Sequence, residues 1–260
     1  MGAAEAFAEL VRIMARLRGP NGCPWDREQS HDSIKPYLIE EAYEVAEAIE
    51  SNDFDELRKE LGDLLLQIVF HAQMASEAGR FHVEDVINAI NEKMVRRHPH
   101  VFAEVAVKDS DEVLRNWAKI KSEERKDSSD RSALAGVPRA LPALLRAHRL
   151  GEKAAHVGFD WTRASEVWNK VREEVSELDT ALKDEDRAAI DAELGDLLFA
   201  LSSLARHLDL RSEDALQRAS DRFLQRFHYI EGRLAEQQRD VHAASPAELD
   251  ALWEEAKRKL

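Results

Sequence analysis

The chain has 260 residues, with 37 lysines and arginines against 51 aspartates and glutamates, and a formal net charge of −14. Hydrophobic residues make up 44% of it, which is enough for a core and excludes a disordered chain. The excess of carboxylates disfavours direct binding to nucleic acid or to an anionic membrane, because like charges repel. A phosphate-bearing ligand would therefore need a bridging cation.

The longest apolar stretch, at 64–72, is shorter than the roughly 20 residues that span a bilayer. The single cysteine, Cys23, excludes an intrachain disulfide and a zinc site built from cysteines. We therefore expect a cytoplasmic protein without a membrane partner.

Almost every segment between the glycines and prolines repeats apolar residues every three to four positions, which is typical of amphipathic helices. The pattern predicts an all-α fold. In the first half we expect a loop at 23–26 and helices at 3–18, about 33–50, 54 to about 78, 83–98 and 111–126. Residues 127–138 have the composition of a linker.

Two acidic motifs of the first half recur 133 residues farther along the chain. They are Glu-Glu-x-x-Glu and Glu-Leu-Gly-Asp-Leu-Leu, at 40–44 and 60–65 in the first half and at 173–177 and 193–198 in the second. One shared offset for two motifs indicates a tandem duplication. We expect two copies of one helical-bundle domain, at 1–126 and 139–260, joined by the linker at 127–138.

The acidic motifs place carboxylates on two facing helices. Residues three apart share a helix face, so Glu41 lies beside Glu44, and Glu60 beside Asp63. The short turn between the helices predicts an antiparallel hairpin centred on Asn52, in which Glu41 faces Asp63 and Glu44 faces Glu60 at equal height. The second half repeats the arrangement about Glu185, with Glu174, Glu177, Glu193 and Asp196.

Four converging carboxylates repel one another unless a cation lies among them. Oxygen ligands favour Mg²⁺, with Mn²⁺ as a substitute, and Mg²⁺ also accepts phosphate oxygens as ligands. Acidic residues three apart are commonly only a solvated helix face, but such a face needs neither matched height nor duplication. A di-iron bundle is the competing architecture, and its Glu-x-x-His motif occurs only at 28–31, in a predicted loop.

Basic and aromatic residues also recur in both halves. Pairs of basic residues four apart lie on one helix face, and a lysine follows a tryptophan by four positions. These residues are Lys93, Arg97, Trp117 and Lys121 in the first half, and Arg222, Arg226, Trp253 and Lys257 in the second. They are candidates for binding the phosphates and base of a nucleotide, and the alternatives are a solvated basic face and tryptophans that pack in the core.

With these motifs the chain resembles the MazG family of all-α nucleoside triphosphate pyrophosphohydrolases, in its form with two tandem domains. The segments at 22–26 and 96–102 resemble the first domain of two-domain members. The resemblance implies Mg²⁺-dependent cleavage of nucleoside triphosphates such as ATP, and of their deoxy forms, between the α- and β-phosphates, giving a monophosphate and pyrophosphate. It also implies a homodimer and a housecleaning role that removes unwanted nucleotides.

On this hypothesis the eight carboxylates hold Mg²⁺, which polarises the phosphates and lowers the pKa of an attacking water. Glu40 and Glu173 complete a second metal site or act as the general base. Each points about 100° away from the neighbouring ligand, so a supporting role behind the ligands is an equal alternative. A repeat that only senses nucleotide or dimerises, and a purely structural helical adaptor, also remain open.

Overall fold

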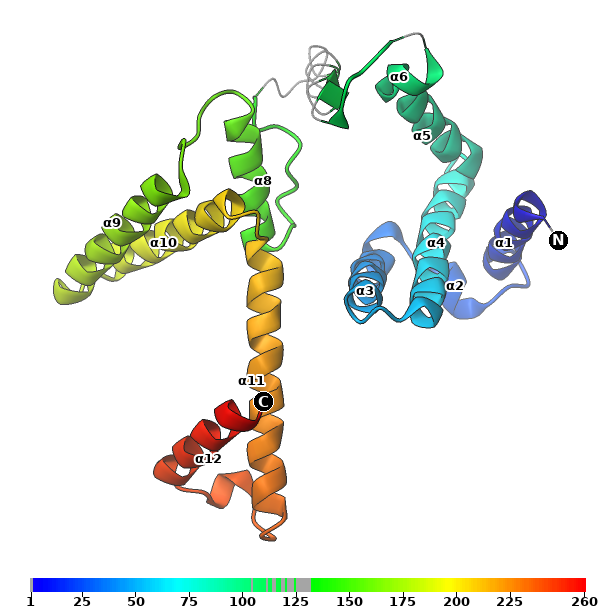
Figure 1. Ribbon diagram of the computed structural model, residues 1–260. Coiled ribbons are helices and arrows are strands. Elements are labelled where there is room, and N and C mark those ends of the chain that lie inside the picture. The colour runs from blue at the N-terminus through cyan, green and yellow to red at the C-terminus, as the bar shows by residue number, and fades with distance from the viewer. Residues whose placement is uncertain are drawn as a thin grey trace. The chain divides into compact units, whose positions relative to one another are not determined.

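The structure is a computed structural model that describes residues 2–103, 105–110, 112–113, 116–117, 120, 124 and 132–260. The chain divides into two compact units, Met1–Trp117 and Ala118–Leu260 (Figure 1). The described residues form helices and turns, without a strand, so the predicted all-α fold is confirmed. None of the helices among them is long and apolar enough to cross a membrane.

The predicted helix at 111–126 lies largely outside the described residues, as does the first part of the predicted linker, 127–131. Residues 132–138 are turns and irregular backbone. The domain boundaries at 126 and 138 therefore stay a prediction.

In the first unit the helices agree closely with the sequence pattern. They are α1 (Ala3–Arg18), α2 (Pro24–Glu28), α3 (His31–Glu50), α4 (Phe54–Glu77), α5 (Val83–Arg97) and α6 (Pro99–Phe102). The loop predicted at 23–26 is wrong, because Pro24 begins the short helix α2. Proline suits this first helical position, where its missing N–H has no partner to lose and its fixed φ is already helical.

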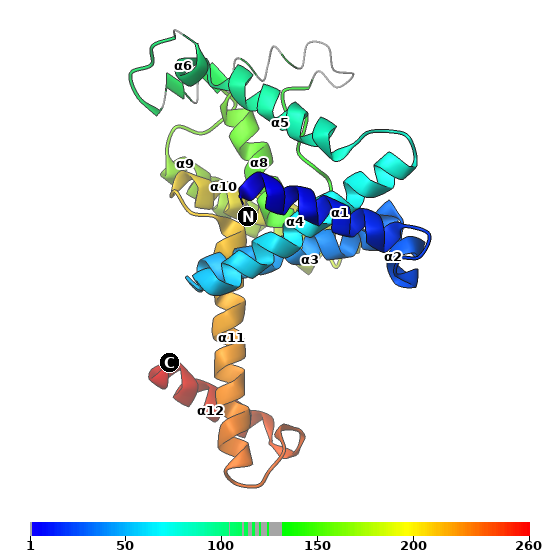
Figure 2. The ribbon, with the colours of Figure 1, turned by 90° about the vertical axis from the view of Figure 1, so that its right-hand side faces the viewer.

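The second unit repeats the central hairpin of the first. Its elements are α8 (Ala143–Ala155), α9 (Ala164–Lys183), α10 (Arg187–His207), α11 (Ser212–Ala235), the 3₁₀ helix η1 (Val241–Ala243) and α12 (Pro246–Lys259). Helix α9 packs along α10, as α3 packs along α4. Both hairpins can be followed in Figures 1 and 2.

The turn of each hairpin has the same construction. Asn52 and Glu185, the predicted centres, both adopt left-handed backbone, with φ of 55° and 54°. Asp53 and Asp186 follow them and cap the next helix, each carboxylate accepting hydrogen bonds from two backbone N–H groups in the first turn at 3.0–3.1 Å. The tight reversal fixes which residues of the two helices lie at equal height.

The core of the first unit joins α1, α3 and α4. Met14, Ile34, Val69, Phe70 and Met74 are buried and pack together, with Phe7, Leu10, Val11 and Leu66 at the edge. Each fully buried side chain of this size contributes about 1.5–3 kcal/mol relative to exposure. The packing is concentrated in the C-terminal half of α4, so the N-terminal half, which carries Glu60, faces α3 without such a core.

One arginine fastens α1 and α2 to the end of α4. The Arg18 guanidinium donates to the Glu77 carboxylate at 2.7–3.0 Å and lies 5.4 Å from the centre of the Phe70 ring. It also donates to the backbone carbonyls of Asp26 and Gln29. The Arg18 side chain is only 8% exposed, whereas that of Glu77 is 37% exposed, so water reaches the pair from the carboxylate side.

In the second unit an acid performs the corresponding task. The Asp160 carboxylate, in the loop before α9, accepts hydrogen bonds from the two terminal nitrogens of Arg206 at 2.6 and 2.8 Å. His207 Nε2 lies 3.0 Å from the same carboxylate. The hydrogen bonds from Arg206 are the largest cause that lowers the pKa of Asp160 to about 2. These contacts fasten the beginning of the acidic hairpin to its end.

We expect Asp160→Asn to lower the free energy of unfolding of the second unit by about 1–3 kcal/mol at pH 7, because it leaves the shielded Arg206 guanidinium without its anion. Since the folded-state pKa is depressed, the contribution is complete above the ordinary value of 3.8 and is lost as the pH falls through about 2. Roughly half of the difference in free energy of unfolding between wild type and Asp160→Asn should remain near pH 3. Denaturant unfolding at several pH values measures it, with Asp191→Asn, an exposed position on α10, as the control. A difference that does not change with pH would contradict the ion-pair origin.

Candidate functional site

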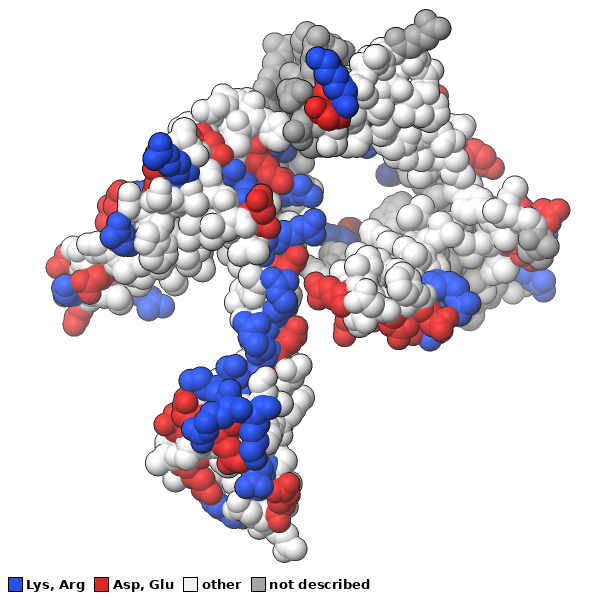
Figure 3. Space-filling model, viewed as in Figure 1, with Lys and Arg blue, Asp and Glu red and all other residues white. Residues whose placement is uncertain are grey.

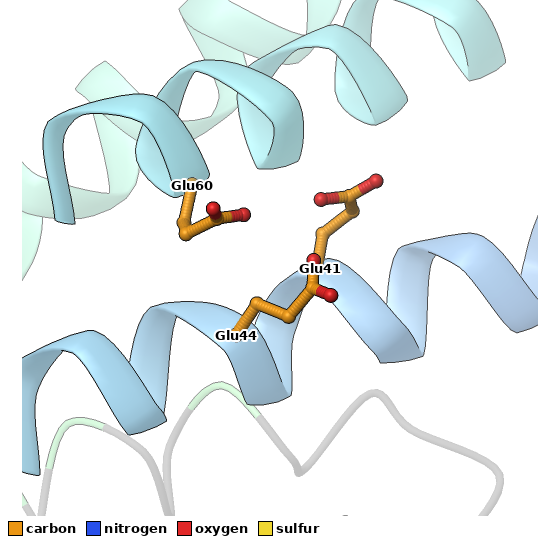
Figure 4. A group of neighbouring side chains, drawn as sticks. All are labelled: Glu41, Glu44 and Glu60. Atoms are coloured by element: carbon orange, nitrogen blue, oxygen red, sulfur yellow. The ribbon is translucent and has the colours of Figure 1, made fainter. Parts of the chain in front are cut away.

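Three carboxylates of the first hairpin converge between its helices. Oxygen atoms of Glu41, Glu44 and Glu60 all lie within 4.8 Å of one another. Figure 4 shows Glu41 and Glu44 rising from α3 toward Glu60 on α4. We call these residues the first acidic cluster. The cross-helix pairing expected from the turn is present, since Glu44 acts electrostatically on Glu60 and Asp63 on Glu41.

The first acidic cluster is electrostatically unfavourable in the absence of a cation. Desolvation by burial is the main cause that raises the pKa of Glu41, and the charges of Asp63 and Glu44 raise it further. Desolvation also raises the pKa of Glu60 to about 7, followed by a hydrogen bond with Glu56 and the charge of Glu44. Both pKa shifts show that the charged carboxylates are disfavoured here, first by desolvation and then by neighbouring acidic residues.

The second hairpin repeats the arrangement with one difference. Oxygens of Glu174, Glu177 and Glu193 again lie within 4.8 Å of one another, and we call these residues the second acidic cluster. The Lys170 ammonium lies 2.7 Å from the Glu174 carboxylate and 2.6 Å from that of Glu173. These two hydrogen bonds raise the pKa of Lys170, which therefore carries its positive charge at neutral pH.

The last acid of each predicted set lies outside these close groups. Asp63 is near enough to raise the pKa of both Glu41 and Glu60. Asp196, its counterpart, is exposed on α10. Glu40 and Glu173 are exposed beside the clusters, and Glu173 is paired with Lys170.

The four predicted substrate-binding residues of the second unit all lie on α11 and α12. The Arg226 guanidinium lies 5.6 Å from the centre of the Trp253 ring, and Lys257 pairs with Glu254 at 2.8 Å. Figure 3 shows lysines and arginines gathered over these two helices. Helix α12 packs on α11, whereas α9 packs on α10, and α10 also contacts α8 and the helix that follows it, α11 (Figure 1). The structure thus does not bring these residues to the acidic cluster of the same unit.

In the first unit Lys93 and Arg97 lie on α5, and the Trp117 ring meets that of His98 edge-on, with ring centres 5.0 Å apart. Lys121 lies outside the described residues. The corresponding tryptophan, Trp253, contacts Phe223 at 5.2 Å between ring centres. The two tryptophans therefore have different aromatic neighbours.

The sequence patterns did not predict a role for three residues near these sites. Lys170 precedes Glu173 and Glu174 by three and four residues, a spacing that predicts ion pairs on one helix face and was a usable signal. Gln67, buried on α4, hydrogen-bonds Glu41 and follows Asp63 by one turn. Phe223 lies next to Arg222 and gave no signal of its own.

The residues present fit a small, hard divalent cation. Each acidic cluster offers oxygen ligands only, from two facing helices, and Glu44 and Glu177 are exposed, so one side of each cluster stays open to water or to a phosphate. Mg²⁺ and Mn²⁺ prefer such ligands and retain open positions for substrate oxygens. The raised pKa values of Glu41 and Glu60 show that their charged forms are disfavoured here, and a bound cation would stabilise those charged forms.

Comparison of the sequence with known proteins identifies its family. The MazG nucleotide pyrophosphohydrolase domain matches residues 29–102 and 164–229, which include both hairpins. The chain therefore belongs to the MazG nucleotide pyrophosphohydrolase family, with two tandem copies of the domain.

Several curated proteins are similar over almost the whole chain. A nucleoside triphosphate pyrophosphohydrolase of Escherichia coli (strain K12) is 47% identical over 253 residues, which cover 96% of each protein. A nucleoside triphosphate pyrophosphohydrolase/pyrophosphatase MazG of Thermotoga maritima is 45% identical over 252 residues, 96% of this chain and 95% of that protein. The uncharacterised protein YabN of Bacillus subtilis is 47% identical over 252 residues, but these cover only 51% of its length.

We expect Glu60→Gln to raise the thermal unfolding midpoint of the metal-free protein, and to raise it more at pH 8 than at pH 5. A carboxyl whose folded-state pKa is raised from 4.5 to about 7 costs stability as the pH rises through that interval, whereas glutamine does not titrate. Circular dichroism melting in a chelating buffer measures the effect, with Glu47→Gln, an exposed position on α3, as the control. An equal midpoint for Glu60→Gln and wild type at pH 8 would show that the cluster is not repulsive.

Proposed function

We propose that the chain is a Mg²⁺-dependent nucleoside triphosphate pyrophosphohydrolase. It would cleave ribo- and deoxyribonucleoside triphosphates between the α- and β-phosphates, releasing a monophosphate and pyrophosphate, and so remove unwanted nucleotides from the cytoplasmic pool. The single observation that carries the proposal is the convergence of three carboxylates at the same place in both repeats. The family and the names of the relatives support it.

In the proposed function, the acidic residues have two roles, which are cation binding and proton transfer. The two acidic clusters, with Asp63 and Asp196, hold the cation. When bound, Mg²⁺ neutralises phosphate charge and lowers the pKa of a coordinated water. Glu40 and Glu173, beside the clusters, accept the proton of the attacking water or hold the ligands in place. Mn²⁺ would substitute, since it prefers the same ligands.

The substrate's polyphosphate and base would be bound by the residues on the other helices. Arg222, Arg226 and Lys257 offer cations to the phosphates, and Trp253 offers its ring to the base. Lys93, Arg97, Trp117 and Lys121 are the counterparts in the first repeat. Because α11 runs from the end of α10 away from the acidic hairpin and α12 packs on α11 (Figure 1), a second copy of the chain would complete the site.

The proposal therefore includes a homodimer. Leu61, Leu65 and Ile68 form an apolar stripe on α4 and are 37–50% exposed. Their counterparts 133 residues later, Leu194, Leu198 and Leu201 on α10, are 40–46% exposed. Exposed apolar stripes at matching positions are typical of surfaces that another molecule covers. A dimer with two-fold symmetry covers such a stripe with itself.

A narrower alternative is that one repeat binds nucleotide or supports the dimer without catalysing hydrolysis. The chain offers a specific reason to keep it, because the acidic clusters differ in Lys170 and the tryptophans differ in their neighbours. Single-site variants of the full chain distinguish the two possibilities.

We expect Glu44→Ala with Glu177→Ala to reduce the conversion of ATP to AMP and pyrophosphate by roughly 100-fold or more, because each removes an oxygen from its acidic cluster. The single variants assign the activity to one repeat or to both. Pyrophosphate release from the full-length chain, with Mg²⁺ in excess, is the measurement.

Glu47→Ala and Asp191→Ala serve as controls, because they remove exposed acids from α3 and α10 outside the clusters. Both should keep wild-type turnover. If the double variant in the clusters also keeps it, the carboxylates are not catalytic.

We expect Leu65→Glu with Leu198→Glu to convert a dimer into a monomer, because the new carboxylates would be buried against their own copies. Light scattering after size-exclusion chromatography measures the mass, and Leu260→Glu, at an exposed terminal position, is the control. A wild-type chain that is monomeric at every concentration would mean that the stripes are covered within one chain.

A further inference from the structure

The two acidic clusters of the chain start from different charge states. In the second, the Lys170 ammonium is already bound to Glu173 and Glu174, and Glu174 is only 4% exposed. In the first, the causes that shift the pKa of Glu41 and Glu60 are desolvation, neighbouring carboxylates and the Gln67 amide. No cation appears among those causes in the part of the chain that the structure describes.

The difference originates at one sequence position. The residue 133 places before Lys170 is Tyr37, which lies at the same point of the first hairpin. Its ring meets that of Trp25 edge-on, with ring centres 6.1 Å apart, and it is 42% exposed. Tyrosine carries no positive charge at neutral pH, so the first acidic cluster has no counterpart of the Lys170 ammonium.

We propose that Lys170 is a built-in counter-ion that competes with the divalent cation at the second acidic cluster, so that the two repeats of one chain load metal at different concentrations. The inference rests on the proposed function, since it takes both clusters as metal sites. The first cluster binds metal tightly without nucleotide, whereas the second binds it weakly.

The two clusters would differ in metal affinity because their electrostatic energies differ in the metal-free protein. A divalent cation that enters the first cluster relieves repulsion that no lysine or arginine among the described neighbours offsets. At the second cluster the ammonium already neutralises part of that charge, and the metal must separate it from a shielded carboxylate before binding Glu174. An ion pair to a desolvated partner is costly to break, because the remaining charge loses its compensation.

The competition has a structural consequence. Lys170 is 35% exposed at its side chain and lies on a flexible four-carbon stem, so the ammonium is free to move into solvent when it is displaced. Glu174 is fixed on α9 and stays in the cluster. Displacement therefore needs a rotation of one side chain and no movement of a helix.

Metal titration without nucleotide tests the proposal directly. Mn²⁺ binding to the full-length chain is followed by electron paramagnetic resonance, and Mg²⁺ binding by calorimetry. Glu44→Gln and Glu177→Gln each remove a ligand from one cluster, so the binding that remains belongs to the other. The Kd of the second cluster should exceed that of the first by roughly ten-fold.

The decisive variants change Lys170 and its counterpart. In the Glu44→Gln background, Lys170→Met keeps most of the aliphatic stem but removes the charge, and it should lower the Kd of the second cluster for Mn²⁺ by roughly ten-fold. Lys170→Arg keeps the charge and should keep the weak binding. In the Glu177→Gln background, Tyr37→Lys should raise the Kd of the first cluster.

Tyr37→Lys keeps the proposal testable if Lys170→Met does not fold. It should weaken metal binding at the first cluster, whereas Lys170→Met should strengthen metal binding at the second. Unchanged or weaker metal binding in folded Lys170→Met, or unchanged binding in Tyr37→Lys, would overturn the counter-ion role. Failure of the metal sites themselves looks different, since Glu44→Gln and Glu177→Gln would then leave all metal binding intact.

Discussion

The mutual repulsion of carboxylates held at one height between two antiparallel helices is the constraint on which the rest of this structure depends. Contacts elsewhere in each hairpin help to hold three carboxylate oxygens within 4.8 Å of one another. In the first unit the core of α1, α3 and α4 and the Arg18 contacts supply that stability. In the second, Asp160 joins the beginning of the hairpin to its end. The energy of a packed core thus holds charges together that would separate in water.

The turn residues show how the same constraint acts on the backbone. Left-handed φ is readily adopted by asparagine, but Glu185 adopts it with a larger side chain and without the advantage of glycine. A relaxed, longer turn would release that strain but would shift the register between the helices. The strained reversal keeps Glu177 level with Glu193, just as Asn52 keeps Glu44 level with Glu60. Register, more than turn stability, is what these residues maintain.

Most helix boundaries and the facing acidic residues could be predicted from the sequence. The features that could not be predicted depend on tertiary packing. The apolar periodicity and the helix-ending residues predicted the boundaries of α1, α3, α4 and α5 to within about two residues, because amphipathic spacing and caps are local properties of the sequence. Symmetry about Asn52 predicted which acids face each other. The helix at 24–28 and the contacts of Gln67 escaped, since a five-residue helix has no period and an amide's partner is decided by tertiary packing. The distance between the acidic hairpin and the basic helices α11 and α12 is likewise a property of packing, which similar motifs in both repeats did not reveal.

The separation of the acidic hairpin from the basic residues of α11 and α12 agrees with the proposed binding of a polyphosphate. If Arg222, Arg226 and Lys257 lay against Glu174 and its neighbours in the same unit, the opposite charges would pair and occupy the ligands that a metal and a phosphate require. Distance leaves the acidic residues available for a cation and the basic residues available for an anion. In the proposed function, a triphosphate with its divalent cation would contact both groups. Lys170 is the exception. Its ammonium lies one helical turn from the second acidic cluster and forms ion pairs with Glu173 and Glu174.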